Sequence, residues 1–261
     1  MSLDQPAQIV KHQSWTEDAF LGGKLRLAQP RHGFRAGLDS VLLGAAISLP
    51  SAHVLDLGAG VGTASLVALV HDPALCATLV ESNAEMLALA HLNIASNGAT
   101  DRATALSLDL TAPGALRVAA GLRTDFYSSV IANPPYFNAA GGTPARDFGR
   151  ATARHMGTNM LDRWVKTAAG SAASGGEVIF VYPAPSLAPL LDAFAQRFGA
   201  ITILPLSPRP EAPATRVLVR AVKGSRAPLT LQATRALHEA SGRDFAPAFD
   251  AIFRGEARLC W

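Results

Sequence analysis

The residues Asn133-Pro134-Pro135-Tyr136 combine an amide, a rigid backbone turn and an aromatic ring within four positions. They follow the largely apolar run 129–132. Two adjacent prolines cannot lie inside a helix or a central strand, so we expect a buried strand to end here. Pro134 also restricts Asn133 to an extended conformation. Such a turn, at the carboxyl end of a strand where open α/β sheets bind ligands, suits a flat substrate that bears an NH2 group.

Residues 56–62 read D-L-G-A-G-V-G and follow an expected buried strand at 53–57. The glycines allow a sharp turn and a close approach between a ligand and the backbone. The dinucleotide fingerprint G-x-G-x-x-G/A is missed at Thr63, and Asp56 would repel a pyrophosphate, so a nicotinamide oxidoreductase is disfavoured. A carboxylate at this position suits a cationic ligand such as S-adenosylmethionine, which carries an ammonium and a sulfonium group.

Two further acids fall at the ends of the next expected strands. Glu81 follows the strand 77–80, and Asp109 follows the strand 104–108. Each is one β-α unit away from its neighbours, so together with the two patterns above they would line one edge of a parallel sheet. We expect Glu81 to accept the ribose hydroxyls of the cofactor and Asp109 to accept its adenine amino group.

Strand and helix signals alternate along the chain. The expected strands are 53–57, 77–80, 104–108, 129–132, 178–182, 201–204 and 217–222. The expected helices are 39–46, capped by Asp39 or Ser40, then 63–70, 83–97, 161–173, closed by Gly175-Gly176, and 187–198, closed by Gly199. This alternation predicts a doubly wound α/β fold with a mostly parallel, seven-stranded sheet and helices on both faces, a Rossmann-like arrangement.

We expect three parts: an N-terminal extension packed on the core (1–34), the main domain (35–227) and a C-terminal extension of the same domain (228–261), built from a strand, a loop and a short helix. Half of the residues are hydrophobic and 16% are charged, which is enough for a large core. No run resembles a signal peptide or a membrane span, and two distant cysteines suit a reducing compartment, so we expect a soluble cytoplasmic protein. Neither the cysteines nor the histidines show metal-ligand spacing, and we expect no metal.

Positive charge flanks an acidic middle. The region 56–125 holds seven acids and three bases, whereas 24–35 holds four bases and no acid. The region 146–166 holds five bases and two acids, and 209–226 holds five bases and one acid. These flanks would attract a polyanion such as a nucleic acid, although arginines that merely solvate helix faces would produce the same pattern.

The D-x-G-x-G-x-G pattern resembles motif I of class I methyltransferases, and Asn133 to Tyr136 resemble motif IV of amino-methyltransferases, [DNS]-P-P-[YFW]. The resemblance implies methyl transfer from S-adenosylmethionine to a planar amino nitrogen. If the Asn133 oxygen and the Pro134 carbonyl accept its two hydrogens, the nitrogen lone pair becomes localised and nucleophilic. Pro135 keeps the turn rigid, and Tyr136 would stack on a flipped-out base.

Four further segments resemble the bacterial tRNA(valine) adenine-N6-methyltransferases. They are R-A-G-L-D-S-V-L-L (35–43), R-A-T-A-R-H (150–155), T-R-V-L-V-R-A-V-K-G (215–224) and L-H-E (237–239). The resemblance places Gly37 and Asp39 at the methionine end of the cofactor, and it implies an adenine beside the anticodon of a tRNA as the acceptor. Arg150 and Arg154 would bind the nucleic acid. Met156 departs from the pattern, because many relatives have an acid there.

Three alternatives stay open. A release-factor-type glutamine methyltransferase shares N-P-P-Y, but about 55 residues before Asp56 are too few for its helical N-terminal domain. An adenine methyltransferase acting on rRNA or DNA has the same chemistry, although a DNA enzyme usually adds a target-recognition domain, for which there is no room after Val222. A non-catalytic adaptor that binds S-adenosylmethionine or RNA would not need an intact Asn133-Pro134-Pro135-Tyr136.

Overall fold

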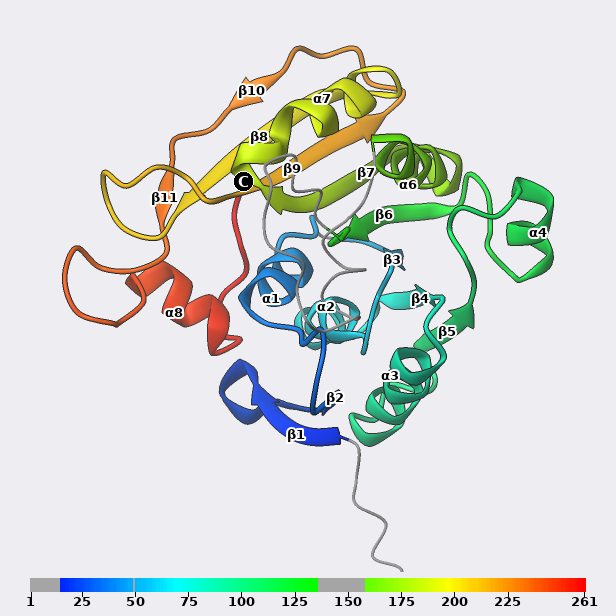
Figure 1. The fold of residues 1–261 in the computed structure, drawn as a ribbon, viewed down its shortest axis with the longest axis horizontal. Coiled ribbons are helices and arrows are strands. Elements are labelled where there is room, and N and C mark those ends of the chain that lie inside the picture. Colours follow the sequence, from blue (N-terminus) through cyan, green and yellow to red (C-terminus); the bar gives the residue numbers. More distant parts are fainter. Residues whose placement is uncertain (1–14, 49, 136–157) are drawn as a thin grey trace, which may run out of the picture.

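The structure, a computed structural model, describes residues 15–48, 50–135 and 158–261. Within these ranges a nine-stranded sheet has the order β10-β8-β9-β7-β6-β3-β4-β5, and β11 pairs with β8 (Figure 1). Its strands are β3 (His53–Leu57), β4 (Cys76–Glu81), β5 (Ala103–Ser107), β6 (Tyr127–Ala132), β7 (Ala172–Pro183), β8 (Phe198–Ser207), β9 (Arg216–Lys223), β10 (Thr230–Leu231) and β11 (Arg235–Ala236). The doubly wound fold is therefore confirmed. Seven long strands form it, and two short strands extend its edge.

Helices cover both faces of the sheet. They are α1 (Leu38–Ala45), α2 (Thr63–His71), α3 (Ala84–Ser96), α4 (Gly114–Ala119), α6 (Thr158–Ser171), α7 (Leu187–Ala195) and α8 (Pro247–Phe253), with a 3-10 turn, η2, at Ala184–Ser186. The central strand β7 is buried on both faces: Ile179 and Val181 pack with α1, α2 and α8, whereas Val178 and Phe180 pack with α6 and α7. This alternation follows from the two-residue period of a strand, so a continuous apolar run serves two cores.

The pairing directions bring the predicted site to one edge. β3, β4, β5, β6 and β7 are parallel, so their carboxyl ends meet there. Among the described strands of this sheet, only β9 runs against both of its neighbours, and it begins at that same edge with Arg216. None of the described helices has the length and apolarity to cross a membrane.

The N-terminal part forms a β-hairpin that the sequence pattern did not predict. β1 (Trp15–Phe20) pairs antiparallel with β2 (Leu25–Pro30) around a 3-10 turn, η1 (Leu21–Gly23). Acids in β1, such as Glu17 and Asp18, are poor strand formers, which hides the hairpin in the sequence. Buried Leu25 and Leu27 of β2 join the same hydrophobic core as α2 and α3.

Three predicted helix ends were wrong. Gly37 is the N-cap of α1 without a side-chain hydrogen bond, so neither Asp39 nor Ser40 caps it. α6 stops at Ser171, and Gly175 and Gly176 lie inside β7. A Cβ on Gly176 would lie 2.9 Å from the carbonyl oxygen of Tyr127, so this glycine permits close strand packing rather than helix termination.

The third wrong end is that of α7, which stops at Ala195. Phe198 already belongs to β8, and its ring packs edge-on against Phe194 with 5.3 Å between centroids. Burial of this aromatic pair therefore overrides the helical pattern that continued to residue 198.

The C-terminal part returns to the sheet edge and to α1. β10 and β11 each pair in parallel with β8, and α8 packs against α1. The last residues then satisfy carbonyls at the end of α1: the Leu259 N–H donates to Ala45 O at 3.0 Å, and Trp261 Nε1 donates to Ala46 O at 2.7 Å. The C-terminal tail thus holds in place a helix that contributes to the site.

Candidate active site

The glycine loop between β3 and α2 has the backbone that its sequence predicts. Gly58, Gly60 and Gly62 have φ of 65°, 57° and 88°, a region that other residues rarely adopt. A Cβ on Gly58 would lie 2.3 Å from the Trp164 ring, so this glycine is also needed for packing. No atom of the described residues lies within 4 Å of a Cβ placed on Gly60, which leaves space over the middle of the loop in this part of the structure.

Asp56 lies on β3 just before this loop and is 2% exposed. Its Oδ2 accepts hydrogen bonds from Ser65 Oγ at 2.9 Å and from the Ser65 N–H at 3.3 Å. Burial raises the pKa of the Asp56 carboxyl from 3.8 to about 7, the charge of Glu81 adds to the rise, and the Ser65 hydrogen bonds oppose it. A cation brought beside Asp56 would therefore stabilise its ionised form.

Glu81 ends β4, as predicted, and its carboxylate contacts the glycine loop. Its Oε2 accepts from the Gly60 N–H at 2.9 Å, and its Oε1 accepts from the Asn83 N–H at 2.8 Å. Asp109 lies two residues beyond the end of β5, is exposed, and accepts hydrogen bonds from Thr111. Both acids therefore lie at the sheet edge that carries Asp56.

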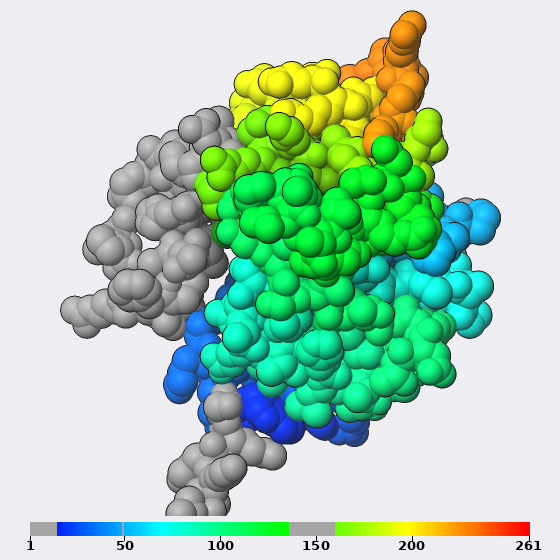
Figure 2. All heavy atoms as spheres, turned by 90° about the vertical axis from the view of Figure 1, so that its right-hand side faces the viewer, coloured from blue at the N-terminus to red at the C-terminus, as the bar shows by residue number. Residues whose placement is uncertain are grey.

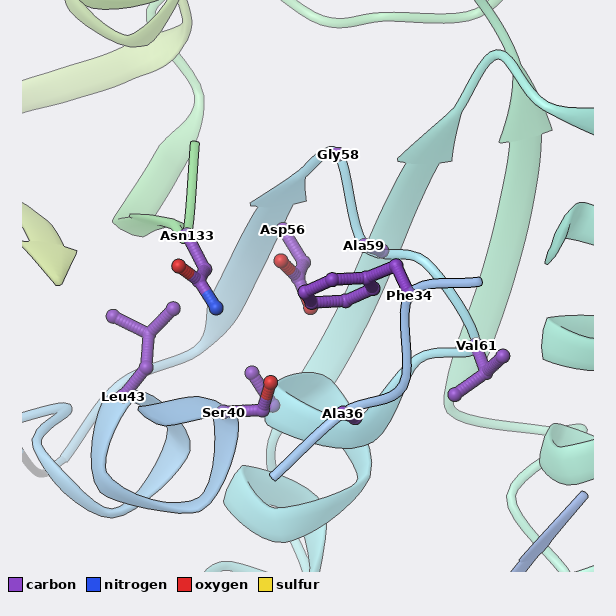
Figure 3. Close-up of a pocket in the computed structure, with 10 residues that line it drawn as sticks. Phe34, Ala36, Ser40, Leu43, Asp56, Gly58, Ala59, Val61 and Asn133 are labelled. Carbon is purple, nitrogen blue, oxygen red and sulfur yellow. The ribbon is translucent and has the colours of Figure 1, made fainter. Parts of the chain in front are cut away.

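A cavity that opens to solvent brings the two predicted patterns together (Figure 3). Asn133 follows β6, and its amide points into the cavity, as does the carboxyl group of Asp56. The lining residues are Phe34, Ala36, Ser40, Leu43, Asp56, Gly58, Ala59, Val61, Ala64 and Asn133. Of the predicted site residues, Asp56, Gly58 and Asn133 thus line one cavity.

The other predicted residues lie around this cavity or outside the described part. Gly37, Asp39, Gly60, Glu81 and Asp109 do not line it. Pro134 and Pro135 are described, and Pro134 is buried beside Asn133. Tyr136, Arg150 and Arg154 lie outside the described residues.

Asp39 has a partner from a distant part of the chain. Its carboxylate forms an ion pair with Arg216 Nε at the start of β9, and its side chain is 14% exposed. The pair ties the first turn of α1 to the sheet. Ser40, the next residue, reaches the cavity instead.

Two polar or aromatic contributors were missed, Phe34 and Ser40. Phe34 directly precedes the R-A-G-L-D-S-V-L-L segment, and Ser40 lies inside it, so proximity to that segment was the available signal. A third missed residue, Asn93 on α3, is fully buried. Its Nδ2 donates to Ala28 O and Val61 O at 3.0 Å each, and its Oδ1 accepts from the Ala28 N–H at 2.7 Å. Asn93 thus joins the hairpin to the glycine loop.

The chemistry of the lining fits S-adenosylmethionine better than a nucleotide pyrophosphate. The cavity contains a buried carboxyl, an amide, a hydroxyl and apolar groups, and none of the described residues that line it is Lys, Arg or His. Among the described lining residues a dianionic phosphate group would meet Asp56 and no basic side chain, whereas a sulfonium and an ammonium would be attracted to that carboxyl. The glycine loop leaves open space that would admit the cofactor close to the backbone.

Known proteins resemble this chain along most of its length. Residues 38–205 match the family described as methyltransferase small domain. A Vibrio parahaemolyticus protein named tRNA1(Val) (adenine(37)-N6)-methyltransferase is 28% identical over 193 residues, which is 73% of this chain and 77% of that protein. A protein of the same name from Shewanella loihica is 30% identical over 190 residues, 71% of this chain and 76% of that protein. The crystal structure of a predicted O-methyltransferase from Agrobacterium tumefaciens has a TM-score of 0.72 and 31% identity, and covers 85% of this chain and 98% of that one.

Proposed function

This chain belongs to the methyltransferase small domain family, and we therefore propose that it transfers the methyl group of S-adenosylmethionine to the N6 amino group of an adenine in tRNA. The observation that carries the proposal is the shared cavity of Asn133 and Asp56 (Figure 3). An amide that can bind an amino group lies beside a carboxyl that can attract the methyl donor. The names of the two sequence relatives supply the adenine and the tRNA.

On the cofactor side, Asp56 would attract the cationic methionine end, and the open backbone of Gly58 and Gly60 would lie against the cofactor. Glu81 would accept the ribose hydroxyls, and Asp109 would accept the adenine amino group. The position of both acids at one sheet edge supports these roles. When bound, S-adenosylmethionine supplies an electrophilic methyl group on its sulfonium.

At the methionine end we propose roles for Gly37 and Asp39. Gly37 is the N-cap of α1, and the start of a helix can bind a carboxylate through its amide groups. The ion pair between Asp39 and Arg216 would keep that turn in position.

On the acceptor side, the Asn133 amide oxygen and the Pro134 carbonyl would accept the two hydrogens of the adenine amino group. These hydrogen bonds pull the nitrogen toward a tetrahedral geometry and localise its lone pair. The thioether is a good leaving group, so positioning and electrostatics suffice without a strong base. Pro135 would hold the turn, and Tyr136 would stack on the flipped-out base.

A nitrogen acceptor agrees with this site better than the oxygen acceptor that the name of the Agrobacterium protein indicates. A hydroxyl offers one hydrogen, whereas Asn133 and Pro134 together provide two acceptors. A glutamine side chain also presents a planar NH2 group, so a release-factor glutamine is the second candidate acceptor.

The test is incubation of the protein with methyl-labelled S-adenosylmethionine and, separately, total tRNA, rRNA, duplex DNA and a release factor. We expect label in tRNA alone, at N6 of an adenine once the modified nucleoside is mapped. Label in the release factor or in rRNA would replace the proposed acceptor. A cytoplasmic location and a main domain at 35–227 belong to the same proposal, since tRNA is a cytoplasmic substrate and the family match lies within that range.

A further inference from the structure

Phe34 presents a half-exposed aromatic ring to the cavity that holds Asp56 and Asn133. The residue is 40% exposed, although aromatic rings are usually covered. Figure 3 draws its ring in front of the carboxyl group of Asp56, with Asn133 on the other side of that carboxyl. The proposed roles of Asp56 and Asn133 do not use this ring.

The hairpin holds the segment that carries Phe34. Arg35 forms an ion pair with Asp18 of β1 and donates to Thr16 Oγ1 at 2.8 Å and to Pro30 O at 2.6 Å. The next residue, Ala36, donates its N–H to Gln29 Oε1 at 2.7 Å. Both residues that follow Phe34 are therefore fixed, which keeps Phe34 at the cavity.

A sulfonium needs this kind of surface. It carries a positive charge but no N–H or O–H group, so it cannot donate a hydrogen bond of this kind to the protein. A nearby anion and the negative face of an aromatic ring are the groups that attract such a cation. The acceptor nitrogen at Asn133 must reach the sulfonium methyl, which requires the sulfonium to lie in this cavity within reach of Asn133.

We propose that the face of Phe34 contacts the sulfonium of S-adenosylmethionine and, with Asp56, makes the site prefer the charged donor over the neutral product. Methyl transfer breaks the bond between the sulfonium sulfur and the methyl carbon and forms a bond from that carbon to the acceptor nitrogen. The nitrogen then releases a proton to water, and the sulfonium becomes an uncharged thioether. The contact with the ring then weakens, and product release becomes easier. This inference rests on the cofactor of the proposed function and not on its acceptor.

Calorimetry with S-adenosylmethionine and S-adenosylhomocysteine, without RNA, tests the proposal. Phe34→Leu keeps an apolar side chain but removes the π face. We expect it to weaken binding of S-adenosylmethionine about 5- to 30-fold and to change binding of S-adenosylhomocysteine less than about 3-fold. Phe34→Tyr and Phe34→Trp keep a ring and should retain the wild-type ratio of the two affinities.

The surface variant Leu92→Ala is the matched control, because Leu92 on α3 is 41% exposed and lies outside the cavity. Phe34→Met provides a second apolar variant in case the leucine perturbs folding, which circular dichroism would detect. Equal weakening of both ligands by Phe34→Leu would overturn the proposal and leave the ring as an apolar wall. Unchanged binding of both ligands would also overturn it. A wild-type protein that binds both ligands but methylates no tRNA would contradict the proposed function and leave this comparison intact.

Discussion

Asp56 shows how one residue can couple the fold to its ligand. Its carboxyl group is buried beside the glycine loop, and Ser65 is its hydrogen-bond partner. Ser65 does not bring a positive charge, so burial keeps the pKa of Asp56 at about 7. The residue is therefore poised between a neutral form that suits the buried site and an ionised form that suits a bound cation.

Asp56→Asn should change how stability depends on pH. The pKa of Asp56 in the folded protein lies above its ordinary value of 3.8. Between about pH 4 and pH 7 the folded protein therefore keeps a proton that the unfolded chain has already released. That proton stabilises the fold at low pH, and the contribution is lost as the pH rises through about 7. Without cofactor, the free energy of unfolding of the wild type should fall by about 2–3 kcal/mol relative to the variant between pH 5 and pH 8.

Urea unfolding of both proteins at pH 5 and at pH 8 measures this difference. The two stabilities are compared at each pH, so titration of all other groups cancels. A constant difference between variant and wild type would mean that Asp56 is already ionised at pH 5.

Asn133→Ala should separate chemistry from cofactor binding. The variant removes one of two acceptors for the amino group, so we expect kcat to fall at least about 100-fold. Affinity for S-adenosylmethionine should stay within about 3-fold of wild type, because the acids and the glycine loop remain. Single-turnover kinetics and calorimetry give the two quantities. An equal loss of both would assign Asn133 to the cofactor site alone.

Among the elements, the hairpin and α3 support the glycine loop through one buried amide. Asn93 reaches both Ala28 of β2 and Val61 of the loop. Val61 lines the cavity, as do Phe34 and Ala36 from the segment after the hairpin. The hairpin therefore helps to shape the site although it stands outside the main sheet.

Asn93→Ala should cost about 2–4 kcal/mol of stability, because it leaves the buried N–H and C=O of Ala28 and the C=O of Val61 without their partner. It should also weaken binding of S-adenosylmethionine through the displaced loop. Asn97→Ala is the matched control. Asn97 also bonds β2, at the N–H and C=O of Arg26, but it is half-exposed and does not reach the loop.

Chemical unfolding and calorimetry measure both effects. We expect Asn97→Ala to cost less than about 1 kcal/mol and to leave cofactor affinity unchanged. If the two variants behave alike, the contact with Val61 does not hold the loop.

For the whole molecule, the direction of β9 separates the bases of one basic stretch, 209–226. Figure 2 shows the chain running from the hairpin (blue), through α3 and α4, to the β8 and β10 edge. The basic stretch 209–226 is split by the direction of β9: Arg216 begins the strand at the cofactor edge, whereas Lys223 ends it at the opposite edge. Lys223 pairs with Asp125 there. The bases of this stretch do not form a single surface.

Replacement of both Arg150 and Arg154 by Ala should weaken tRNA binding and reduce the slope of log K against log salt by about 1–2. The control is the double variant of Arg123 and Arg226, two exposed residues at the opposite edge, where β6 begins and β9 ends. Filter binding from low to moderate salt measures both slopes. Equal slopes in the two double variants would show that position 150–154 has no special role in binding RNA.

The sequence alone determines those features of the site that depend on residues adjacent in the chain, namely local backbone conformation and the ends of strands. Gly58 must turn in a left-handed conformation, Asn133 must follow a strand because two prolines come next, and Glu81 must end its strand. Parallel strands then place these residues at one edge, which is why the fold class and the shared cavity could be predicted.

The distant segments that complete that edge are set by tertiary packing. Phe34 reaches the cavity because the hairpin holds the next two residues, and Asn93 bridges two elements that lie far apart in the chain. Asp39 pairs with Arg216 because packing brings the start of α1 to the start of β9. Local patterns report backbone preference and burial, whereas contacts of this kind depend on how the elements pack against one another, and that packing is a property of the whole chain.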